Sequence, residues 1–304
     1  MSHTTYRYLF YSIGHDSLNS LLSRDKDFHD YAVEFDYPFK SVSSVQLVCS
    51  CDGLVCLWFG GKKLFCIWNP ATREYKKLSE SNRRYVSIVA LGYDCKTNDY
   101  KLLAGGESLF EICSLGLNSW KTVQYKFYGR LGSNQSGVLV NGDFHWLAKK
   151  QDSFTVIVSM NISNEIFNEM ELPRELWEND HTFNLGVLDG CLCSPVRGVD
   201  MNSLDICVMQ DYGVRESWTK RYTVETITGP YWRPIWYFRT GEIVFAGSGG
   251  LFWYSPEYGR VRRPNISKST GVLEEEIYFE SLVSLNSRTY VEGRRTNSQN
   301  SDII

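Results

Sequence analysis

The sequence predicts an all-β fold, a single β-propeller of six four-stranded blades, with five or seven blades as the alternatives. The first observation behind this prediction is a phrase that recurs about every 47 residues. In each copy an apolar run is broken by a tight turn, and a second polar turn follows. The first turns end at Gly53, Asp99, Gly142, Gly190 and Gly241, at gaps of 46, 43, 48 and 51 residues. A repeat of this length accommodates one unit of four strands.

The second observation is a change of polarity across each unit. In the first unit the second expected strand, 54–59, contains no polar residue, whereas the fourth, 73–78, mixes polar and apolar residues. A sheet with one face in water would alternate polar and apolar residues along every strand. Inner strands that are apolar on both faces indicate a sheet stacked between two neighbours. This is the arrangement of a propeller blade, whose outer strand lies at the rim.

Each unit divides at its turns into four expected strands. The turn after the first strand is an Asp-Gly pair or a similar pair, as in a tight β-hairpin. In the first unit the expected strands are 45–50, 54–59, 64–68 and 73–78. In the next four units they are 87–93, 99–104, 109–114 and 120–124; 137–140, 143–148, 154–160 and 166–172; 184–188, 191–196, 204–210 and 217–224; 234–239, 242–246, 251–254 and 260–263.

The two ends of the chain are expected to complete a sixth unit together. Segments 278–285 and 288–292 would be its first and second strands, and segments 6–12 and 18–22 its third and fourth. Sharing one sheet between the ends closes the ring and removes exposed sheet edges.

The remaining segments are less regular. Residues 24–44 are expected to form a loop with one strand at 31–35, and one helical turn is expected to begin at Pro173. The predicted domain spans residues 1–293, and residues 294–304 form a disordered polar tail.

The overall composition excludes several classes of partner. The formal net charge is -3, from 32 basic and 35 acidic residues, which gives no electrostatic case for nucleic acid or an anionic membrane. No signal peptide and no apolar run long enough to span a membrane are visible. None of the nine cysteines forms a Cys-x-x-Cys motif, so we expect small buried hydrophobes in a reducing compartment and no metal site. We therefore expect a cytoplasmic or nuclear protein.

The sequence contains no recognisable catalytic motif, and we predict a protein that is not an enzyme, with no catalytic residue and no cofactor. His145, in an otherwise apolar strand, is interpreted as a core or rim histidine rather than a general base. Glu274, Glu275 and Glu276 are interpreted as a solvated acidic patch rather than a metal site. The recurring tryptophans are interpreted as packing anchors of the blades: Trp68, Trp120, Trp146, Trp218 and Trp253.

Several phrases resemble the F-box-associated domain of plant F-box proteins, a kelch-like propeller. The opening pair is CDGLVCL at 51–57 and IWNPATREYKKL at 67–78. Further phrases follow in the same order and spacing over about residues 45–290: LGYD at 91–94, NDYKLL at 98–103, LNSWK at 117–121, GVLVNGDFHWL at 137–147, ELP at 171–173, LGVLDGCL at 185–192 and YFESLVSL at 278–285.

The resemblance implies the substrate-recognition half of a Skp1–cullin–F-box ubiquitin ligase, in which the associated domain captures an unidentified target protein for degradation. This sequence departs from the family pattern because no helical F-box segment precedes the first expected strand. Binding of a Skp1-type adaptor would therefore need an F-box upstream. Two other functions stay open: a freestanding propeller scaffold or decoy, and a propeller-fold enzyme such as a glycan hydrolase or an oxidase.

The geometry of a four-stranded blade suggests where a partner would bind. Turns after the first and third strands lie at one end of the propeller, and here they are short and uniform. Loops after the second strand and links between blades lie at the other end and vary in length, as recognition loops do. Their arginine and aromatic residues are the predicted partner-binding residues: Arg83, Arg84, Tyr85, Tyr128, Arg130, Trp177, Arg197, Tyr231, Trp232 and Arg233. The alternative is that these side chains fold back to cover the blade edges.

Overall fold

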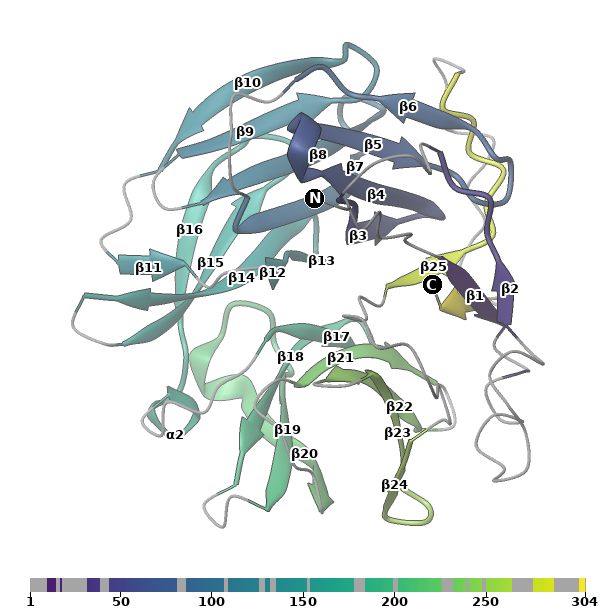
Figure 1. Cartoon of the computed structure of the whole chain (residues 1–304). Coiled ribbons are helices and arrows are strands. Elements are labelled where there is room, and N and C mark those ends of the chain that lie inside the picture. The colour runs from purple at the N-terminus through teal and green to yellow at the C-terminus, as the bar shows by residue number, and fades with distance from the viewer. Residues whose placement is uncertain are drawn as a thin grey trace, which may run out of the picture.

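The strands pair into six sheets that follow one another round the molecule as a β-propeller (Figure 1). The structure, a computed structural model, describes residues 10–14, 17, 32–38, 44–80, 86–106, 109–125, 129–131, 135–151, 154–177, 184–198, 202–225, 232–238, 241–247, 250–263, 276–286 and 301–303. Among these residues, no helix has the length and apolar character that crossing a membrane requires.

Five sheets are each built round an antiparallel meander of four strands that are consecutive in the chain, as the repeat predicts. The first contains β3 (Gln46–Cys51), β4 (Leu54–Phe59), β5 (Leu64–Trp68) and β6 (Tyr75–Lys77), with the 3-10 turn η2 (Gly60–Lys62). The second contains β7 (Ile88–Asp94), β8 (Asp99–Gly106), β9 (Leu109–Ser114) and β10 (Ser119–Gln124).

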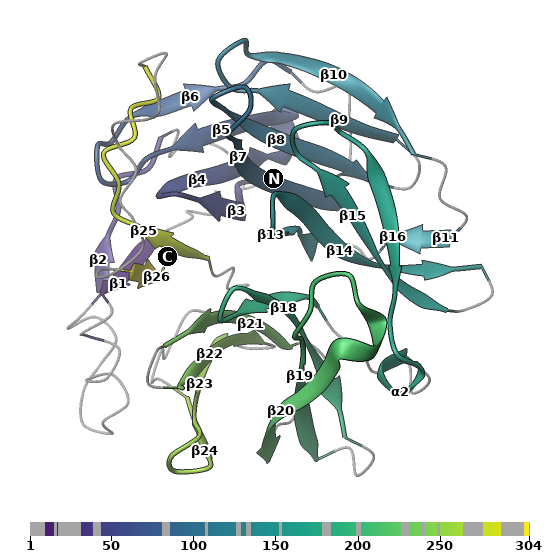
Figure 2. The ribbon, with the colours of Figure 1, turned by 180° about the vertical axis from the view of Figure 1, so that it is seen from behind.

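The third, fourth and fifth sheets repeat this order, and the view from behind shows the same succession (Figure 2). Their strands are β13 (Val138–Val140), β14 (Asp143–Lys150), β15 (Thr155–Asn161) and β16 (Phe167–Glu171); β17 (Gly186–Leu188), β18 (Cys191–Arg197), β19 (Ser203–Met209) and β20 (Trp218–Glu225), with η3 (Arg215–Ser217); and β21 (Trp232–Tyr237), β22 (Ile243–Gly247), β23 (Gly250–Ser255) and β24 (Arg260–Arg262). The helical turn expected at Pro173 is α2 (Arg174–Trp177).

The hairpin turns have the backbone conformation that their residues predict. Asp189 and Gly190 have φ angles of 54° and 75°, and the Asp52-Gly53 and Asn141-Gly142 pairs are alike. Positive φ at both central positions defines the type I′ turn, which matches the twist of the flanking strands. Gly53 is required for a second reason, because a Cβ atom there would lie 2.3 Å from the carbonyl oxygen of Phe279.

The sixth sheet, called the terminal sheet below, contains strands from both ends of the chain. Its order is β2 (Ala32–Glu34), β1 (Tyr11–Gly14), β26 (Ser301–Ile303) and β25 (Ile277–Phe279). The first and third strands of the expected sixth unit are therefore found near their expected positions, as β25 and β1.

The second and fourth strands of the terminal sheet differ from the expectation. Strand β26 lies within the segment 294–304 that the sequence assigns to a disordered tail. The expected second strand at 288–292 and fourth strand at 18–22 lie outside the described residues. Strand β2 takes the fourth place instead, and it comes from the strand expected at 31–35. Strands this short carry little side-chain pattern, so their pairing partners could not be predicted from the sequence.

The link between the second and third sheets makes an excursion that the repeat does not predict. Strand β11 (Gly129–Leu131) pairs with the end of β14, and β13 pairs with its start. Between them, β12 (Gln135–Ser136) leaves to pair in parallel with β7 of the second sheet. Gly137 permits this approach, because a Cβ atom there would lie 2.9 Å from the Cβ of Ala90.

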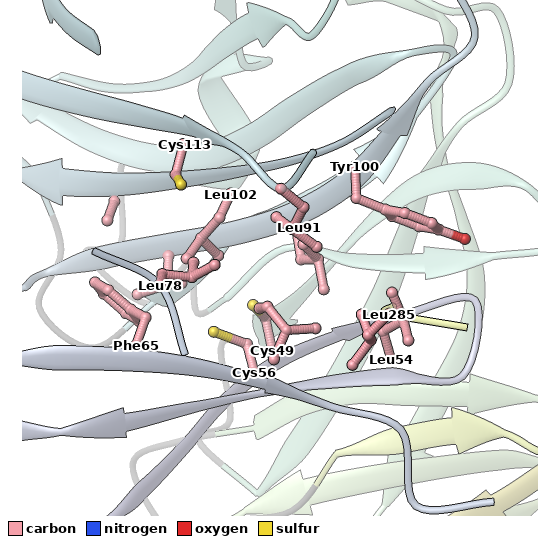
Figure 3. Packing of buried hydrophobic residues seen from close by; sticks show 14 of the residues in the cluster. Cys49, Leu54, Cys56, Phe65, Leu78, Leu91, Tyr100, Leu102, Cys113 and Leu285 are labelled. Atoms are coloured by element: carbon pink, nitrogen blue, oxygen red, sulfur yellow. The ribbon is translucent and has the colours of Figure 1, made fainter. Parts of the chain in front are cut away.

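The core is divided among the junctions between neighbouring sheets. Among the described residues, six clusters of buried apolar side chains occur, and each joins two sheets that are adjacent round the molecule. Figure 3 shows the cluster between the first and second sheets, in which Phe65 and Cys56 face Leu102 and Leu91. Each sheet is thus covered on both faces, which explains the continuous apolar runs of the inner strands.

The cluster between the first and second sheets also takes in residues near the C-terminal end. Val283 and Leu285 are 1% and 2% exposed within it. Asn69, in the turn after β5, donates from Nδ2 to the carbonyl oxygens of Ser281 and Val283, at 3.0 and 2.8 Å. Residues more than 200 positions apart are therefore held together by buried hydrogen bonds.

Glu74 adds a second contact to the same segment. Its carboxylate accepts hydrogen bonds from the Leu285 amide at 2.7 Å and from the Ser284 hydroxyl at 3.2 Å. Together the bonds of Asn69 and Glu74 to residues 281–285 are called the terminal clamp below. An amide donor to a carboxylate is a charge-assisted hydrogen bond, stronger than a neutral one.

A second buried polar contact joins the second and third sheets. The Nζ atom of Lys101 lies 3.0 Å from Asp94 Oδ2 and 2.8 Å from the carbonyl oxygen of Ile162, and both side chains are buried. Ser163 donates a further hydrogen bond to Asp94. Burial alone would raise the pKa of Asp94, but the hydrogen bonds that its carboxylate accepts lower the pKa to about 2.

We predict that Asp94 contributes to stability only where it is ionised. The folded pKa lies below the ordinary value of 3.8, so the contribution is complete above pH 3.8 and is lost as the pH falls towards 2. The D94N variant leaves Lys101 without its buried carboxylate, and we expect a loss of about 3 kcal/mol in unfolding free energy at pH 7. Urea denaturation at several pH values measures this difference.

The control for this prediction is D205N, which alters a carboxylate paired with Lys220 at the exposed rim. It should cost less than about 1 kcal/mol. The difference between wild type and D94N should shrink below pH 4. A difference of the same size at pH 3 and at pH 7 would contradict the assignment.

Candidate interaction surface

The direction of the strands gives the propeller two distinct ends. The hairpin turns after the first and third strand of each sheet form one end, called the turn face below. The loops after the second strands and the links between sheets form the other, called the loop face below. The sequence predicts that a partner binds at the loop face and that the turns of the turn face are short and uniform.

Both ends of the described chain lie at the loop face. Strands β1 and β25 are both antiparallel to β26, so they run in the same direction. Strand β25 leads into residues 281–285, which bind the turn at Asn69 on the turn face. Strand β1 therefore starts, and β26 ends, at the loop face.

Half of the predicted partner-binding residues lie outside the described part of the chain: Arg83, Arg84, Tyr85, Tyr128 and Tyr231. Of the others, Arg130 lies in β11, where its backbone pairs with Lys149 at the end of β14. Trp177 is the last residue of α2, and Arg197 is the half-buried last residue of β18. These three positions are on the loop face, as expected, but on three different elements.

Trp232 is not a surface residue, and its assignment to the binding surface is corrected here. It is 1% exposed and packs between the fourth and fifth sheets, with its ring centroid 4.3 Å from that of Phe252. The reason is that β21 begins at Trp232, two residues earlier than the expected strand at 234. The side chain thereby joins the inward-facing set of the strand.

Arg233 has a partner that the sequence did not predict. Its Nη2 atom lies 3.0 Å from Glu276 Oε1, and the two side chains are only 21% and 11% exposed. The interpretation of Glu276 as part of a solvated acidic patch is therefore wrong, whereas Glu274 and Glu275 lie outside the described residues. The ion pair ties the start of β25 to the fifth sheet, so Arg233 has a structural contact at the loop face.

Two apolar side chains on the loop face were missed. Leu109 and Phe154 are each 42% exposed, at or next to the start of the third strands β9 and β15. The signal was an apolar residue directly after a polar link, at the beginning of a third strand. With Arg197, they give the described part of the loop face both apolar and basic side chains.

His145 is confirmed as a core residue. It is fully buried, with Nε2 2.8 Å from the Tyr212 hydroxyl and Nδ1 3.3 Å from the carbonyl oxygen of Val138. Burial lowers its pKa below the ordinary value of 6.5. Tyr212 in turn donates to Asp143 at 3.1 Å, so the three side chains connect the third and fourth sheets.

The cysteines are free thiols, and most of them are buried. Burial raises the pKa of Cys66 and Cys113 to about 12 and that of Cys207 to about 11. These thiols remain protonated near neutral pH, and a protonated thiol is a poor nucleophile and a poor metal ligand. Within the described residues, no group of three or more His, Cys, Asp or Glu side chains could hold a metal ion.

The tryptophans of the repeat act as packing residues where they are buried. Trp68, Trp146 and Trp253 are at most 2% exposed, and each belongs to a cluster between two sheets. Trp120 packs against the cluster between the first and second sheets and donates from Nε1 to the Ser79 carbonyl oxygen at 2.8 Å. Trp218 is half-buried and packs against the cluster between the third and fourth sheets.

Comparison with known proteins identifies relatives over most of the chain. Residues 8–246 match the family model described as the F-box associated beta propeller domain. The F-box protein CPR1 of Arabidopsis thaliana is 27% identical over 307 residues, which cover 86% of this chain and 74% of that protein. The F-box/kelch-repeat protein At3g23880 of the same plant is 26% identical over 270 residues, covering 84% and 73%.

Among solved structures, a streptogramin B lyase superposes with a TM-score of 0.48 and 11% identity, covering 80% of this chain and 75% of that one.

We predict that W232A destabilises the fold rather than removing a surface contact. Truncating a buried tryptophan leaves a cavity between the fourth and fifth sheets, at a cost of about 3–5 kcal/mol in unfolding free energy. Y258A, which alters a tyrosine that is 59% exposed, should cost less than about 1 kcal/mol. Urea denaturation of both variants compares them. Equal, small losses of unfolding free energy in the two variants would mean that Trp232 is a surface residue.

Proposed function

The chain belongs to the F-box associated β-propeller family, and we propose that it is the substrate-recognition domain of an F-box-type ubiquitin ligase receptor. In this role it binds a target protein and catalyses no reaction itself. The adaptor and the catalytic subunits would be recruited through an F-box on the same polypeptide. The observation that carries the proposal is the match over residues 8–246, together with relatives that are named F-box proteins.

We further propose that the propeller has six blades and is closed by the terminal sheet. Two observations support this. The six apolar clusters form an unbroken cycle of junctions, from the first sheet through the fifth to the terminal sheet and back to the first. The terminal clamp also joins the first sheet to residues 281–285 in the position of a first-strand turn. The domain then extends through β26.

The loop face is the proposed site of target capture. Its links vary in length, and among the described residues it presents Arg197, Leu109 and Phe154, with the backbone of Arg130 on the same face. Arginine and large apolar side chains are the usual anchors of protein interfaces. Arg83, Arg84, Tyr85, Tyr128 and Tyr231 extend this set as a proposal from the sequence.

A reducing compartment, the cytoplasm or the nucleus, is part of the same proposal. The support is that all nine cysteines are free thiols. Disulfides form in oxidising compartments and are rare in cytosolic and nuclear proteins.

The test uses the chain fused downstream of an F-box and expressed in Arabidopsis cells. We expect a small set of proteins whose abundance falls in a proteasome-dependent manner. The triple variant R83A/R84A/Y128A should restore the abundance of these proteins. It should weaken their binding to the chain by tenfold or more, at about 1.4 kcal/mol per tenfold, because interface anchors dominate affinity. The matched control K96A changes an exposed cation on the turn face.

The melting temperature of every variant is measured in parallel. Depletion of the same proteins by wild type and triple variant would place target capture elsewhere. Absence of any proteasome-dependent depletion by the wild-type fusion would overturn the ligase role.

A further inference from the structure

The turn face carries most of the exposed large apolar side chains of the described chain. Of ten such residues, six lie in its hairpin turns: Leu117, Ile166, Tyr212, Val214, Tyr258 and Leu282. Single exposed apolar residues are ordinary on a protein surface, but a concentration at one end is not. The uniform turns of this end therefore present more apolar surface than a purely structural role requires.

Acidic side chains accompany the apolar ones on one half of this face. From the fourth sheet round to the first, the described turns expose six carboxylates: Asp189, Asp211, Glu216, Glu257, Glu280 and Asp52. The exposed cations in the described turns of these sheets are Arg73, Arg260 and Arg215, which pairs with Glu171 at 2.9 Å. This half of the turn face, together with Tyr212, Val214, Tyr258 and Leu282, is called the acidic arc below.

Most of this charge is available to a partner. Within the described part of the chain, Glu216, Glu257 and Glu280 have no ion-pair partner, and Asp189 has only a loose contact of 3.6 Å with Arg221. The chain as a whole has a net charge of only -3, so the arc concentrates negative charge that the rest of the molecule balances. A cationic partner would be attracted to this half of the face specifically.

The apolar side chains of the arc are held in place by their neighbours. Leu282 is 72% exposed, although Ser281 and Val283 on either side are buried and bound through their carbonyl oxygens to Asn69. The alternation forces Leu282 outward.

Tyr212 is fixed in a similar way. Its hydroxyl is held by His145 and Asp143, so its ring is presented on a rigid turn. Anchors fixed before binding lose little entropy when a partner docks.

The acidic arc lies at the opposite end of the propeller from the described chain ends. Strand β1 starts and β26 ends at the loop face, so a module joined before Phe10 would attach at that end. A partner on this side and a target on the loop face could therefore be bound at the same time.

We propose that the acidic arc is a docking surface for a lysine- or arginine-rich protein segment with aliphatic anchor residues. The carboxylates would bind the cations, and Tyr258 and Leu282 would contact the aliphatic side chains. The charge of the arc opposes nucleic acid and anionic membranes, and two copies of the arc would repel each other. This inference is independent of the proposed ligase role.

The test measures the binding of a short fluorescent peptide of alternating lysine and leucine by fluorescence anisotropy. The full chain is used at low and at physiological salt. A matched peptide with glutamate in place of lysine is the ligand control. We expect binding of the lysine peptide only, and a weakening of about tenfold or more in E257K/E280K, whose like charges would oppose the peptide. The L282S variant should weaken binding at both salt concentrations.

Matched variants separate the arc from general electrostatics. K96E changes one side chain by two charge units of the opposite sign on the other half of the turn face and should leave the affinity within about twofold. R83A, at a position that the sequence assigns to the loop face, should also leave it unchanged, whatever the outcome for target capture. All substituted residues of the turn face are exposed, so melting temperatures should match wild type.

Three results would overturn the proposal. The first is no binding of the lysine peptide at physiological salt. The second is a change of affinity in K96E or in R83A as large as the loss in E257K/E280K. The third is a dimer in sedimentation that E257K/E280K disrupts, which would make a second copy of this chain the occupant.

Discussion

The hydrogen bonds of Asn69 and Glu74 to residues 281–285 are the constraint on which the rest of the structure depends. The side-chain oxygen of Asn69 accepts from the amides of Ala71 and Thr72, which shapes its own turn, while its nitrogen donates to two carbonyl groups near the other end of the chain. The second to fifth sheets lie between these two segments in the sequence, together with β6 and β25. Fixing them together therefore fixes the order of the junctions, because each sheet is apolar on both faces and needs a neighbour on each side.

Comparable contacts at other junctions explain how uniform turns can hold a propeller together. Asp94 accepts a hydrogen bond from Ser163 and pairs with Lys101 between the second and third sheets. Asp143 accepts a hydrogen bond from Tyr212 between the third and fourth sheets. In each case a polar residue in or near a first-strand turn meets the third-strand turn of the next sheet. The turn face is thus stiff, and stiffness is what lets it present Leu282 and Tyr212 outward. The links of the loop face are not constrained by these contacts, so they can vary in length.

The sequence was informative where a pattern repeats. The apolar runs located the inner strands of five sheets to within a few residues, and the Asp-Gly and Asn-Gly pairs predicted turns with positive φ, as at Asp189 and Gly190. The strand partners of the two chain ends were only partly predictable, because β26 and β2 are three residues long and carry no periodicity. The site was less predictable still. Whether Trp232 faces a partner or the core depends on a strand start that moved by two residues, and the burial of Glu276 depends on Arg233, a residue 43 positions away.

Native-state hydrogen exchange tests the central role of the terminal clamp most directly. If the clamp holds the two ends together, the amides of Val283 and Leu285 exchange only through global unfolding. Their opening free energies and denaturant dependence should then equal those of amides in β4, and both should fall together in the N69A variant. Exchange of Val283 and Leu285 through a low-energy opening that ignores denaturant, while β4 stays protected, would show that the C-terminal segment is an appendage and would contradict the account.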